Sequence, residues 1–366
     1  MRRRIAGVVS DGMDTKLPLS TRSRVTIAAS LAILAATAGG GLAVSTSSAR
    51  HARAAQSSPD CARYVSRRGS DRWPGTQRRP FRTVRRLASR LRPGQIGCVE
   101  PGATFVEDVT IRRGGTAGLP ITLTSPARPA ATIRGRLYVA DSANHVVISN
   151  LVLDGRNREN IASPTVNGDD ILFDHDEVTN YHTAICFLLG NREYGQAVDV
   201  VIRSSAIHDC GALPANNQEH GIYVEWASGT VITGNAITRN ADRGIQLFPD
   251  AQHSTVTHNF IVANGEGVIM SGDSHAASSD NVVAFNVITD STVRHDVEEW
   301  WQGPVGERNE VTSNCVGGPG SIQQPARGFA IRDNIVLTRS VRMMPIPGGF
   351  CGLPPGLHPG PAQRSR

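Results

Sequence analysis

The chain of 366 residues contains a single lysine, Lys16, so arginine supplies nearly all of its basic side chains. Aromatic residues make up only 5% of the chain. It has no Cys-x-x-Cys pair and no cysteine–histidine spacing typical of a zinc site. These absences exclude lysine as a catalytic base anywhere after residue 16 and argue against a zinc-stabilised domain.

The net charge of +6 comes from one end of the chain. Residues 1–54 hold eight basic and two acidic side chains, which account for the whole excess, and the remainder carries 30 of each sign. A neutral body gives no electrostatic reason to bind nucleic acid. We therefore expect no nucleic-acid partner.

Residues 22–55 are typical of a secretory signal. Arg22 and Arg24 precede an uncharged stretch at 25–44, and Ala52-Arg53-Ala54 offers small residues at the spacing that signal peptidase cleaves. We expect 1–54 to be removed, with a mature N-terminus near Ala55 and a secreted, extracellular, monomeric product that has no membrane contact. The alternative is an uncleaved membrane anchor, because the stretch reaches the ~20 residues that a spanning helix needs.

Disulfide bonds are expected, because an exported chain with an even number of cysteines favours them. Cys61 and Cys98 bracket one N-terminal unit and are expected to pair. Cys315 and Cys351 are a second candidate pair, whereas Cys186 and Cys210 are left either as a pair or as buried thiols. All six cysteines follow the signal segment: Cys61, Cys98, Cys186, Cys210, Cys315 and Cys351.

Residues 55–98 form an expected N-terminal α/β cap. A short strand is predicted over Tyr64–Ser66, and apolar residues at intervals of three or four predict a helix over Pro80–Leu91. Residues 61–93 hold eleven arginines and one acid, Asp71. This charge fits either a solvated surface or contact with an anionic polymer.

Residues 99–337 repeat. Short Val/Ile-rich segments recur without helical periodicity, each built round a polar position with an apolar residue three before it and another two after it. The units are too short for propeller blades and lack the leucine density of leucine-rich repeats. They predict an all-β fold, a right-handed parallel β-helix with ~4.8 Å between rungs, followed by a Pro/Gly-rich tail at 338–366. The polar column is Asn150, Asp176, Ser205, Asn235, Asn259, Asn286, Asn314 and, as an eighth member, Asn334.

These features resemble the pectate-lyase-like right-handed β-helix proteins. The run from Tyr64-Val65-Ser66 through Gly69-Ser70-Asp71 and Pro74-Gly75-Thr76 to Pro80-Phe81-Arg82-Thr83 is similar to the first segment of many secreted members. The asparagine-containing rungs are similar to their repeats. The resemblance covers about residues 61–336 and implies the fold, whereas members include lyases, hydrolases, epimerases and non-catalytic proteins.

A second column gathers ionisable residues. Ala184, Gly221, Gly244 and Gly267 align, and polar residues precede them on successive rungs. Strand alternation places Tyr223 and Gln246 outside, and the same parity puts His220 and Arg243 inside, although parity is weak at a strand's first residue. The alternative to a functional site is a structural Arg243–Glu266 ion pair. The candidate catalytic residues are His220, Arg243, Glu266, Tyr223, Asp242 and Glu219, and the candidate substrate-binding residues are His182, Glu225, Gln246 and Trp226.

Asp169 and Asp170 form a candidate metal site. They are followed closely by further acids, and Ca²⁺ prefers hard oxygen ligands. The alternative is a turn that simply favours aspartate. No cofactor other than Ca²⁺ is expected.

The leading functional hypothesis is action on an acidic polysaccharide by β-elimination or C5 epimerisation. Both reactions remove a proton next to a carboxylate, so they need a base and a cation. His220 is the candidate base, Arg243 the cation, and Tyr223 the group that returns a proton. The alternatives are a glycoside hydrolase using Asp242 and Glu266 and a non-catalytic surface or polysaccharide-binding protein.

Overall fold

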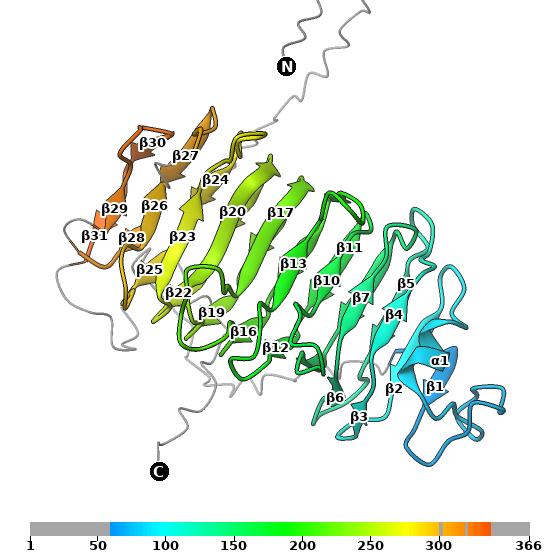
Figure 1. Ribbon diagram of the computed structural model, residues 1–366. Helices are drawn as coiled ribbons and strands as arrows, with labels where there is room; N and C mark the ends of the chain where they lie inside the picture. The colour runs from blue at the N-terminus through cyan, green and yellow to red at the C-terminus, as the bar shows by residue number, and fades with distance from the viewer. Residues whose placement is uncertain (1–58, 300–302, 319–320, 338–366) are drawn as a thin grey trace, which may run out of the picture. The chain divides into compact units, whose positions relative to one another are not determined.

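The computed structural model describes residues 59–299, 303–318 and 321–337. Short parallel strands stack coil on coil into a solenoid, and each coil passes in turn through three sheets, named here I, II and III (Figure 1). The predicted parallel β-helix is confirmed. The expected signal segment, the N-terminus near Ala55 and the 338–366 tail lie outside the described residues. No helix within the described ranges has the length and apolar character needed to cross a membrane.

Sheet I has eleven strands, and its inward side chains form one wall of the core. Ile148, Phe173 and Ile202 lie in register on successive coils and are fully buried. The strands in spatial order are β1 (Arg63–Val65), β2 (Ile96–Val99), β5 (Ile121–Thr124), β8 (Val146–Ser149), β11 (Ile171–Asp174), β15 (Val201–Arg203), β18 (Val231–Thr233), β21 (Thr255–Thr257), β24 (Val282–Ala284), β27 (Asn309–Thr312) and β30 (Phe329–Arg332).

Sheet II follows sheet I in each coil from β2 onward. Its ten short strands are β3 (Thr104–Val106), β6 (Ala131–Arg134), β9 (Leu151–Asp154), β12 (Glu177–Thr179), β16 (Ala206–His208), β19 (Ala236–Thr238), β22 (Phe260–Val262), β25 (Val287–Thr289), β28 (Cys315–Val316) and β31 (Ile335–Val336).

Sheet III contains the longest strands and carries the residues predicted to form the site. Nine strands lie in one row, and β14 (Ala197–Val198) pairs beside them with β17. The row is β4 (Val109–Ile111), β7 (Leu137–Val139), β10 (Thr165–Val166), β13 (Phe187–Leu189), β17 (Ile222–Ser228), β20 (Arg243–Gln252), β23 (Glu266–Met270), β26 (Val297–Glu299) and β29 (Ile322–Gln323).

An asparagine ladder closes the turn from sheet I to sheet II, as predicted. The backbone N–H of Asn259 donates to Oδ1 of Asn286 at 2.9 Å, and Asn286 donates likewise to Asn314 at 3.0 Å. The predicted alignment is wrong at its first member. Asn150 has φ +54° and occupies the left-handed position before the ladder, so Leu151 donates its N–H to Oδ1 of Asp176. The predicted alignment of these two coils is shifted by one residue, because Phe173 pairs with Ile148.

Two further ladders brace the other turns and were not predicted. Asn240 donates its backbone N–H to Oδ1 of Asn264 at 3.0 Å between sheets II and III. Asn281 donates to Oδ1 of Asn309 at 3.0 Å between sheets III and I. Each ladder satisfies buried backbone groups that the turns would otherwise leave unpaired.

The N-terminal cap joins the solenoid through β1, which pairs with β2. Its helix α1 spans only Val84–Ala88, shorter than the predicted Pro80–Leu91. Phe81 instead forms a parallel bridge with Val65, and Thr83 caps the helix by accepting the N–H of Arg86. The spacing of the apolar residues correctly indicated which side chains are buried. The helix begins later than predicted because Phe81 pairs with β1 through its backbone.

Two disulfide bonds join described cysteines. Cys61 pairs with Cys98, which confirms the prediction, and Cys186 pairs with Cys210, which settles the open alternative. Cys315 is also disulfide-bonded, and its predicted partner Cys351 lies outside the described residues.

Candidate functional site

The candidate site lies on the outer face of sheet III, across β17, β20, β23 and β26 (Figure 1). Register places Tyr223 beside Gln246, Gln246 beside Ile269, and Ile269 beside Glu298. These four residues form an outward column on successive coils, about 4.8 Å apart. The predicted outward positions of Tyr223 and Gln246 are thus consistent with the register.

His220 and Arg243 lie on this same outer side, so the parity prediction that placed them inside is wrong. The ring of His220 meets the ring of Tyr223 edge to face, with centroids 5.4 Å apart. Arg243 donates from Nη1 to Oε1 of Gln246 at 3.0 Å. Both residues directly precede a glycine where the chain leaves a turn, and at this point the side chains do not follow the regular alternation of the strand.

Arg243 belongs to a buried charge cluster, defined here as Arg243, Glu266, Arg294 and Glu298. Nε of Arg243 lies 3.3 Å from Oε2 of Glu266, and Nη2 of Arg294 lies 2.6 Å from Oε1 of Glu266. Nε of Arg294 lies 3.4 Å from Oε2 of Glu298. Arginine therefore binds both oxygens of Glu266.

The loop at 211–219 covers the charge cluster. Arg243 donates from Nη1 to the backbone oxygen of Asn217 and from Nη2 to its Oδ1, both at 2.6 Å. These contacts leave Arg243 only 3% exposed. Asn217 has φ +74°, a left-handed backbone that aims both oxygens at the guanidinium group.

Glu219 and Asp242, predicted as catalytic acids, hold this loop in place. Oδ2 of Asp242 accepts the backbone N–H of Glu219 at 2.8 Å. Oε2 of Glu219 accepts the N–H of Ala212 at 3.0 Å. Their observed contacts are therefore with the loop backbone.

His220 is one of the buried titratable groups that the fold leaves with a free hydrogen-bonding position. It is 2% exposed, and its Nδ1 is buried without a hydrogen-bond partner. Burial, and then the charge of Arg243, hold the pKa of His220 well below its usual range, so the imidazole is neutral at pH 7. Burial, and then Glu225, raise the pKa of the Tyr223 hydroxyl, which stays protonated. A neutral base thus lies against a proton donor.

The four predicted substrate-binding residues separate into three places. Gln246 joins the site through Arg243. Glu225, whose pKa burial raises, accepts from Nδ2 of Asn191, and Trp226 lies under Arg192, both further along β17.

His182 stands apart from the other three. Its Nδ1 lies 3.2 Å from the backbone oxygen of Gly211 in a turn. Phe187, not Ile185, pairs with Ile222, so the predicted alignment of Ala184 with Gly221 is wrong by two residues.

Three contributors to the site were missed by sequence reasoning: Asn217, Arg294 and Glu298. Val297 pairs with Val268, so extending the aligned column by one coil would have found Glu298. Asn217 and Arg294 come from loops, where no repeat signals position.

The predicted metal site shows no cage of ligands. Oδ1 of Asp169 accepts the backbone N–H of Val198, and Oδ2 of Asp170 lies 3.2 Å from Nδ1 of His145. Across the described ranges, no three His, Cys, Asp or Glu side chains are placed to hold a metal ion. Calcium binding at Asp169 and Asp170 therefore stays a prediction.

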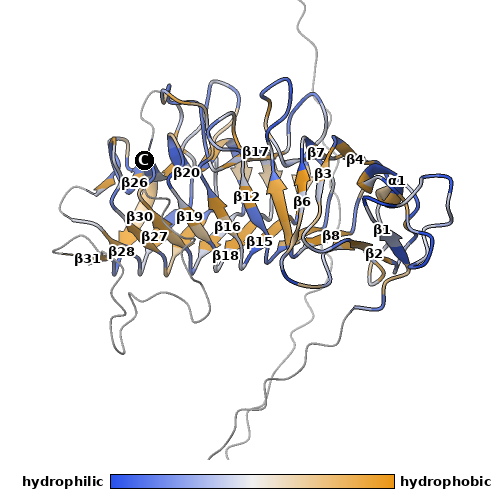
Figure 2. Cartoon of the chain, turned by 90° about the horizontal axis from the view of Figure 1, so that it is seen from below, coloured by the Kyte–Doolittle hydropathy of each residue, from blue (hydrophilic) through white to orange (hydrophobic). Residues whose placement is uncertain are grey.

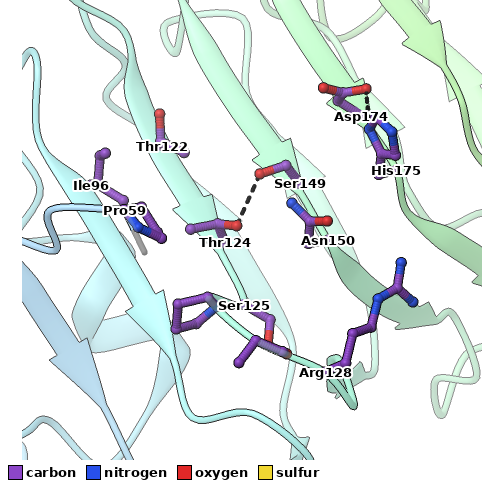
Figure 3. A pocket seen from close by; sticks show the side chains of 12 residues that line it. Pro59, Ile96, Thr122, Thr124, Ser125, Arg128, Ser149, Asn150, Asp174 and His175 are labelled. Atoms are coloured by element: carbon purple, nitrogen blue, oxygen red, sulfur yellow. Dashed lines mark hydrogen bonds and ion pairs between the residues drawn. The ribbon is translucent and has the colours of Figure 1, made fainter. Parts of the chain in front are cut away.

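A hollow of about 550 Å³ lies on sheet I near the cap (Figure 3). Hydroxyl groups line it, with Oγ of Ser149 donating to Oγ1 of Thr124 at 3.0 Å, and Arg128 stands at its rim. Its acid–base pair is Asp174 with His175, and Asp174 also binds Arg203. The hollow therefore lacks an unpartnered buried base, and the site on sheet III is the better candidate for chemistry.

Comparisons with solved structures show the same architecture. A lacto-N-biosidase from Eubacterium ramulus matches with TM-score 0.56 and 14% identity, covering 75% of this chain and 61% of that one. An alginate lyase from Paenibacillus sp. str. FPU-7 matches with TM-score 0.52 and 18% identity over 70% and 93%. Pectate lyase Pel9A matches with TM-score 0.51 and 15% identity over 75% and 76%. The chain spans only about six tenths of the lacto-N-biosidase.

Sequence comparison identifies the family. No match is found among curated proteins. The family model described as the right handed beta helix region matches residues 99–318, more than half of the chain. That range contains the column of Tyr223, Gln246 and Glu298 and the whole charge cluster. The predicted right-handed fold is thereby confirmed, and this chain belongs to the right-handed β-helix family.

Proposed function

We propose that the protein is an extracellular carbohydrate-active enzyme that acts on an acidic polysaccharide at the outer face of sheet III, by β-elimination or C5 epimerisation. Disulfide bonds fit an oxidising, extracellular compartment. Two of the structures that share the fold are named as an alginate lyase and a pectate lyase. Fold likeness alone does not fix activity, so the proposal depends on the chemistry of the site.

The observation that carries the proposal is the unpartnered Nδ1 of His220. Buried polar atoms normally find a hydrogen-bond partner, so an exception calls for an explanation, and a catalytic role is one such explanation. Burial keeps this imidazole neutral, which is the form that accepts a proton. The mature chain offers no lysine as an alternative base.

In the proposed reaction, His220 takes the proton from C5 of a uronic acid residue. For β-elimination, the electron pair of the C5–H bond forms a C4–C5 double bond, and the bond from C4 to the glycosidic oxygen breaks. Tyr223 gives its proton to the departing oxygen. For epimerisation, no C–O bond breaks, and Tyr223 instead delivers a proton to the opposite face of C5. Burial keeps the Tyr223 hydroxyl protonated, as both routes require.

Arg243 and Arg294 supply the positive charge that the reacting carboxylate needs. Negative charge develops on the uronate carboxylate as C5 loses its proton, and arginine can bind that group in a bidentate manner. Arg294 is the more accessible of the two, with 31% of its side chain exposed. Because Asn217 covers Arg243, substrate access to that guanidinium group requires displacement of the 211–219 loop.

Hydrolysis by Asp242 and Glu266 has less support. Asp242 accepts a backbone N–H, and both oxygens of Glu266 are bound by arginine. A hydrolase needs one carboxyl group that can donate a proton. Glu298 is better suited, because burial, and then the charge of Glu266, raise its pKa.

The test is incubation of the purified mature protein with a panel of polyuronates and neutral polysaccharides in D₂O. Unsaturated, ultraviolet-absorbing ends indicate β-elimination, and deuterium at C5 without chain cleavage indicates epimerisation. New reducing ends without unsaturation would replace the proposal with hydrolysis. Binding without any turnover would leave a non-catalytic polysaccharide-binding protein.

A further inference from the structure

The cap exposes a dense group of arginines far from the site on sheet III. This arginine surface is defined here as the eleven arginines of residues 61–93, of which nine are exposed and two half-buried. The loops round β1 and α1 appear as hydrophilic in Figure 2. The residues are Arg63, Arg67, Arg68, Arg72, Arg78, Arg79, Arg82, Arg85, Arg86, Arg90 and Arg92.

The nearby carboxylates do not neutralise these arginines. Both oxygens of Asp71 accept from the backbone of Arg82 and Thr83 or from the Thr83 hydroxyl. Glu107 accepts the backbone N–H groups of Val84 and Arg85 at the start of α1. Glu100 likewise accepts the backbone N–H of Arg67. The three acids bind backbone N–H groups or the Thr83 hydroxyl, and none of them forms an ion pair with a guanidinium group of the arginine surface.

Several exposed arginines elsewhere on the solenoid are used differently. They pair with an acid on the neighbouring coil: Arg203 with Asp174, Arg239 with Asp209, Arg308 with Asp280 and Arg332 with Glu310. No arginine of the cap forms an ion pair with any carboxylate in the part of the chain that the structure describes. An accumulation of like charge without such pairs is unfavourable for the folded state and favours binding of an anionic partner.

We propose that the arginine surface is a second binding site that takes the carboxylate groups of an acidic polysaccharide. Guanidinium groups match carboxylates in a bidentate geometry, and many weak contacts along a polymer add up through effective concentration. The site needs no defined pocket, because a polymer with charge on every residue presents the same groups at any register. It would hold the enzyme on its polymer, while sheet III acts on one segment of it.

The chemistry of the surface favours a polysaccharide over a membrane or a nucleic acid. No large apolar side chain between residues 59 and 98 is exposed, so nothing is placed to insert into lipid. Phe81 is buried, and the guanidinium group of Arg79 lies over Trp73, so these rings offer no free platform for nucleic-acid bases. Phosphate polymers share the negative charge, and the experiment below separates them from carboxylate polymers.

The test compares two variants of equal charge. Arg68→Gln/Arg72→Gln/Arg78→Gln removes three charges from the cap. Arg128→Gln/Arg158→Gln/Arg327→Gln removes three exposed arginines that form no ion pair among the described residues. Binding of the full mature protein to immobilised polygalacturonate is measured against NaCl, with dextran as the neutral matrix. We expect the cap variant to bind roughly tenfold more weakly, the control variant to stay within about twofold, and salt to release both.

Several results would overturn the inference. They are absence of wild-type binding to polygalacturonate, equal weakening in both variants, and tighter cap-dependent binding to duplex DNA, polyphosphate or anionic vesicles than to polygalacturonate. Both variants should fold, because the substituted side chains are solvated. Circular dichroism checks this. Turnover of short oligouronates separates this inference from the proposed function, because it requires sheet III and should not change in the cap variant.

Discussion

Arg243 and Glu266 face each other on adjacent coils, with Nε 3.3 Å from Oε2 and at most 4% of either side chain exposed. Arg294 binds the other oxygen of Glu266, so the pair is part of a larger set of charges. A buried ion pair contributes little stability by itself, but removing one partner leaves an uncompensated charge. The pair thus links two coils, and it also belongs to the candidate site on sheet III.

The first prediction separates these two roles through Arg243→Ala. Because Arg294 still neutralises Glu266, we expect the free energy of unfolding to fall by about 3 kcal/mol, the lower end for a broken buried pair. Turnover should fall by more than the folded fraction does, because the arginine also binds substrate. Denaturant unfolding and turnover are measured at one temperature. Turnover that follows the folded fraction would assign Arg243 a purely structural role.

The second prediction concerns His220→Gln, which keeps a polar side chain and removes the base. Loss of a general base lowers turnover roughly 10²- to 10⁴-fold. We expect that loss with little change in melting temperature, since Nδ1 makes no hydrogen bond that the substitution would break. His182→Gln is the matched control, because His182 lies in a turn outside the column. Full activity of the His220 variant would refute its assignment as base.

The third prediction follows from the depressed pKa of His220. The unfolded chain binds a proton near pH 6.5, whereas burial and Arg243 prevent the folded chain from doing so. His220 therefore contributes stability above about pH 6.5, and this contribution is lost as the pH falls toward the lower folded pKa. On acidification below about pH 6.5, wild type should therefore lose unfolding free energy relative to His220→Gln, which matches it closely at neutral pH. A pH-independent difference would contradict a neutral buried imidazole.

Sequence reasoning found the solenoid because burial repeats with every coil. Side chains that face the core, such as Ile202 and Ile232, must be apolar on every coil. Residues such as Asn235 and Asn259 recur at the turn because each binds the next coil. Register within a coil is less constrained by composition. Asn150 fits the left-handed position as well as the ladder, so the sequence pattern could not separate them.

The site was less predictable because loops complete it. Repetition brought Tyr223, Gln246, Arg243 and Glu266 together correctly. The side on which His220 and Arg243 lie depends on the turn geometry before each strand, and the cover over Arg243 depends on the conformation of Asn217. Neither property leaves a periodic signal.

The fourth prediction uses Asp176, the acid that replaces asparagine in the first ladder. Burial raises the pKa of its carboxyl group to about 8, and one oxygen has no hydrogen-bond partner. The stability that the protonated Asp176 contributes is fully present below its unfolded pKa of 3.8. It is lost as the pH rises through the folded pKa of about 8. Asp176→Asn should therefore stabilise the protein by about 2–4 kcal/mol at pH 9 and much less at pH 4.

The control for that substitution is Asp174→Asn in the same turn. Asp174 binds Arg203 and His175, so its neutralisation should stabilise nothing at either pH. Thermal unfolding at the two pH values compares the pair. If the stability of Asp176→Asn relative to wild type is no greater at pH 9 than at pH 4, the carboxyl group is not held protonated in the folded protein.

The fifth prediction distinguishes proton abstraction from hydrolysis through Glu298→Gln. Oε2 of Glu298 is buried without a hydrogen bond, and its pKa is raised by burial and by Glu266. Its ionisation therefore costs stability, and the loss grows as the pH rises above the unfolded pKa of 4.5. The amide keeps the shape of the side chain and cannot ionise, so the variant should be more stable than wild type at neutral pH. If His220 is the base, turnover should fall by less than about tenfold, because Glu298 then only lines the column. Loss of at least about 10²-fold in a stable, folded variant would instead identify Glu298 as a general acid and favour a hydrolase.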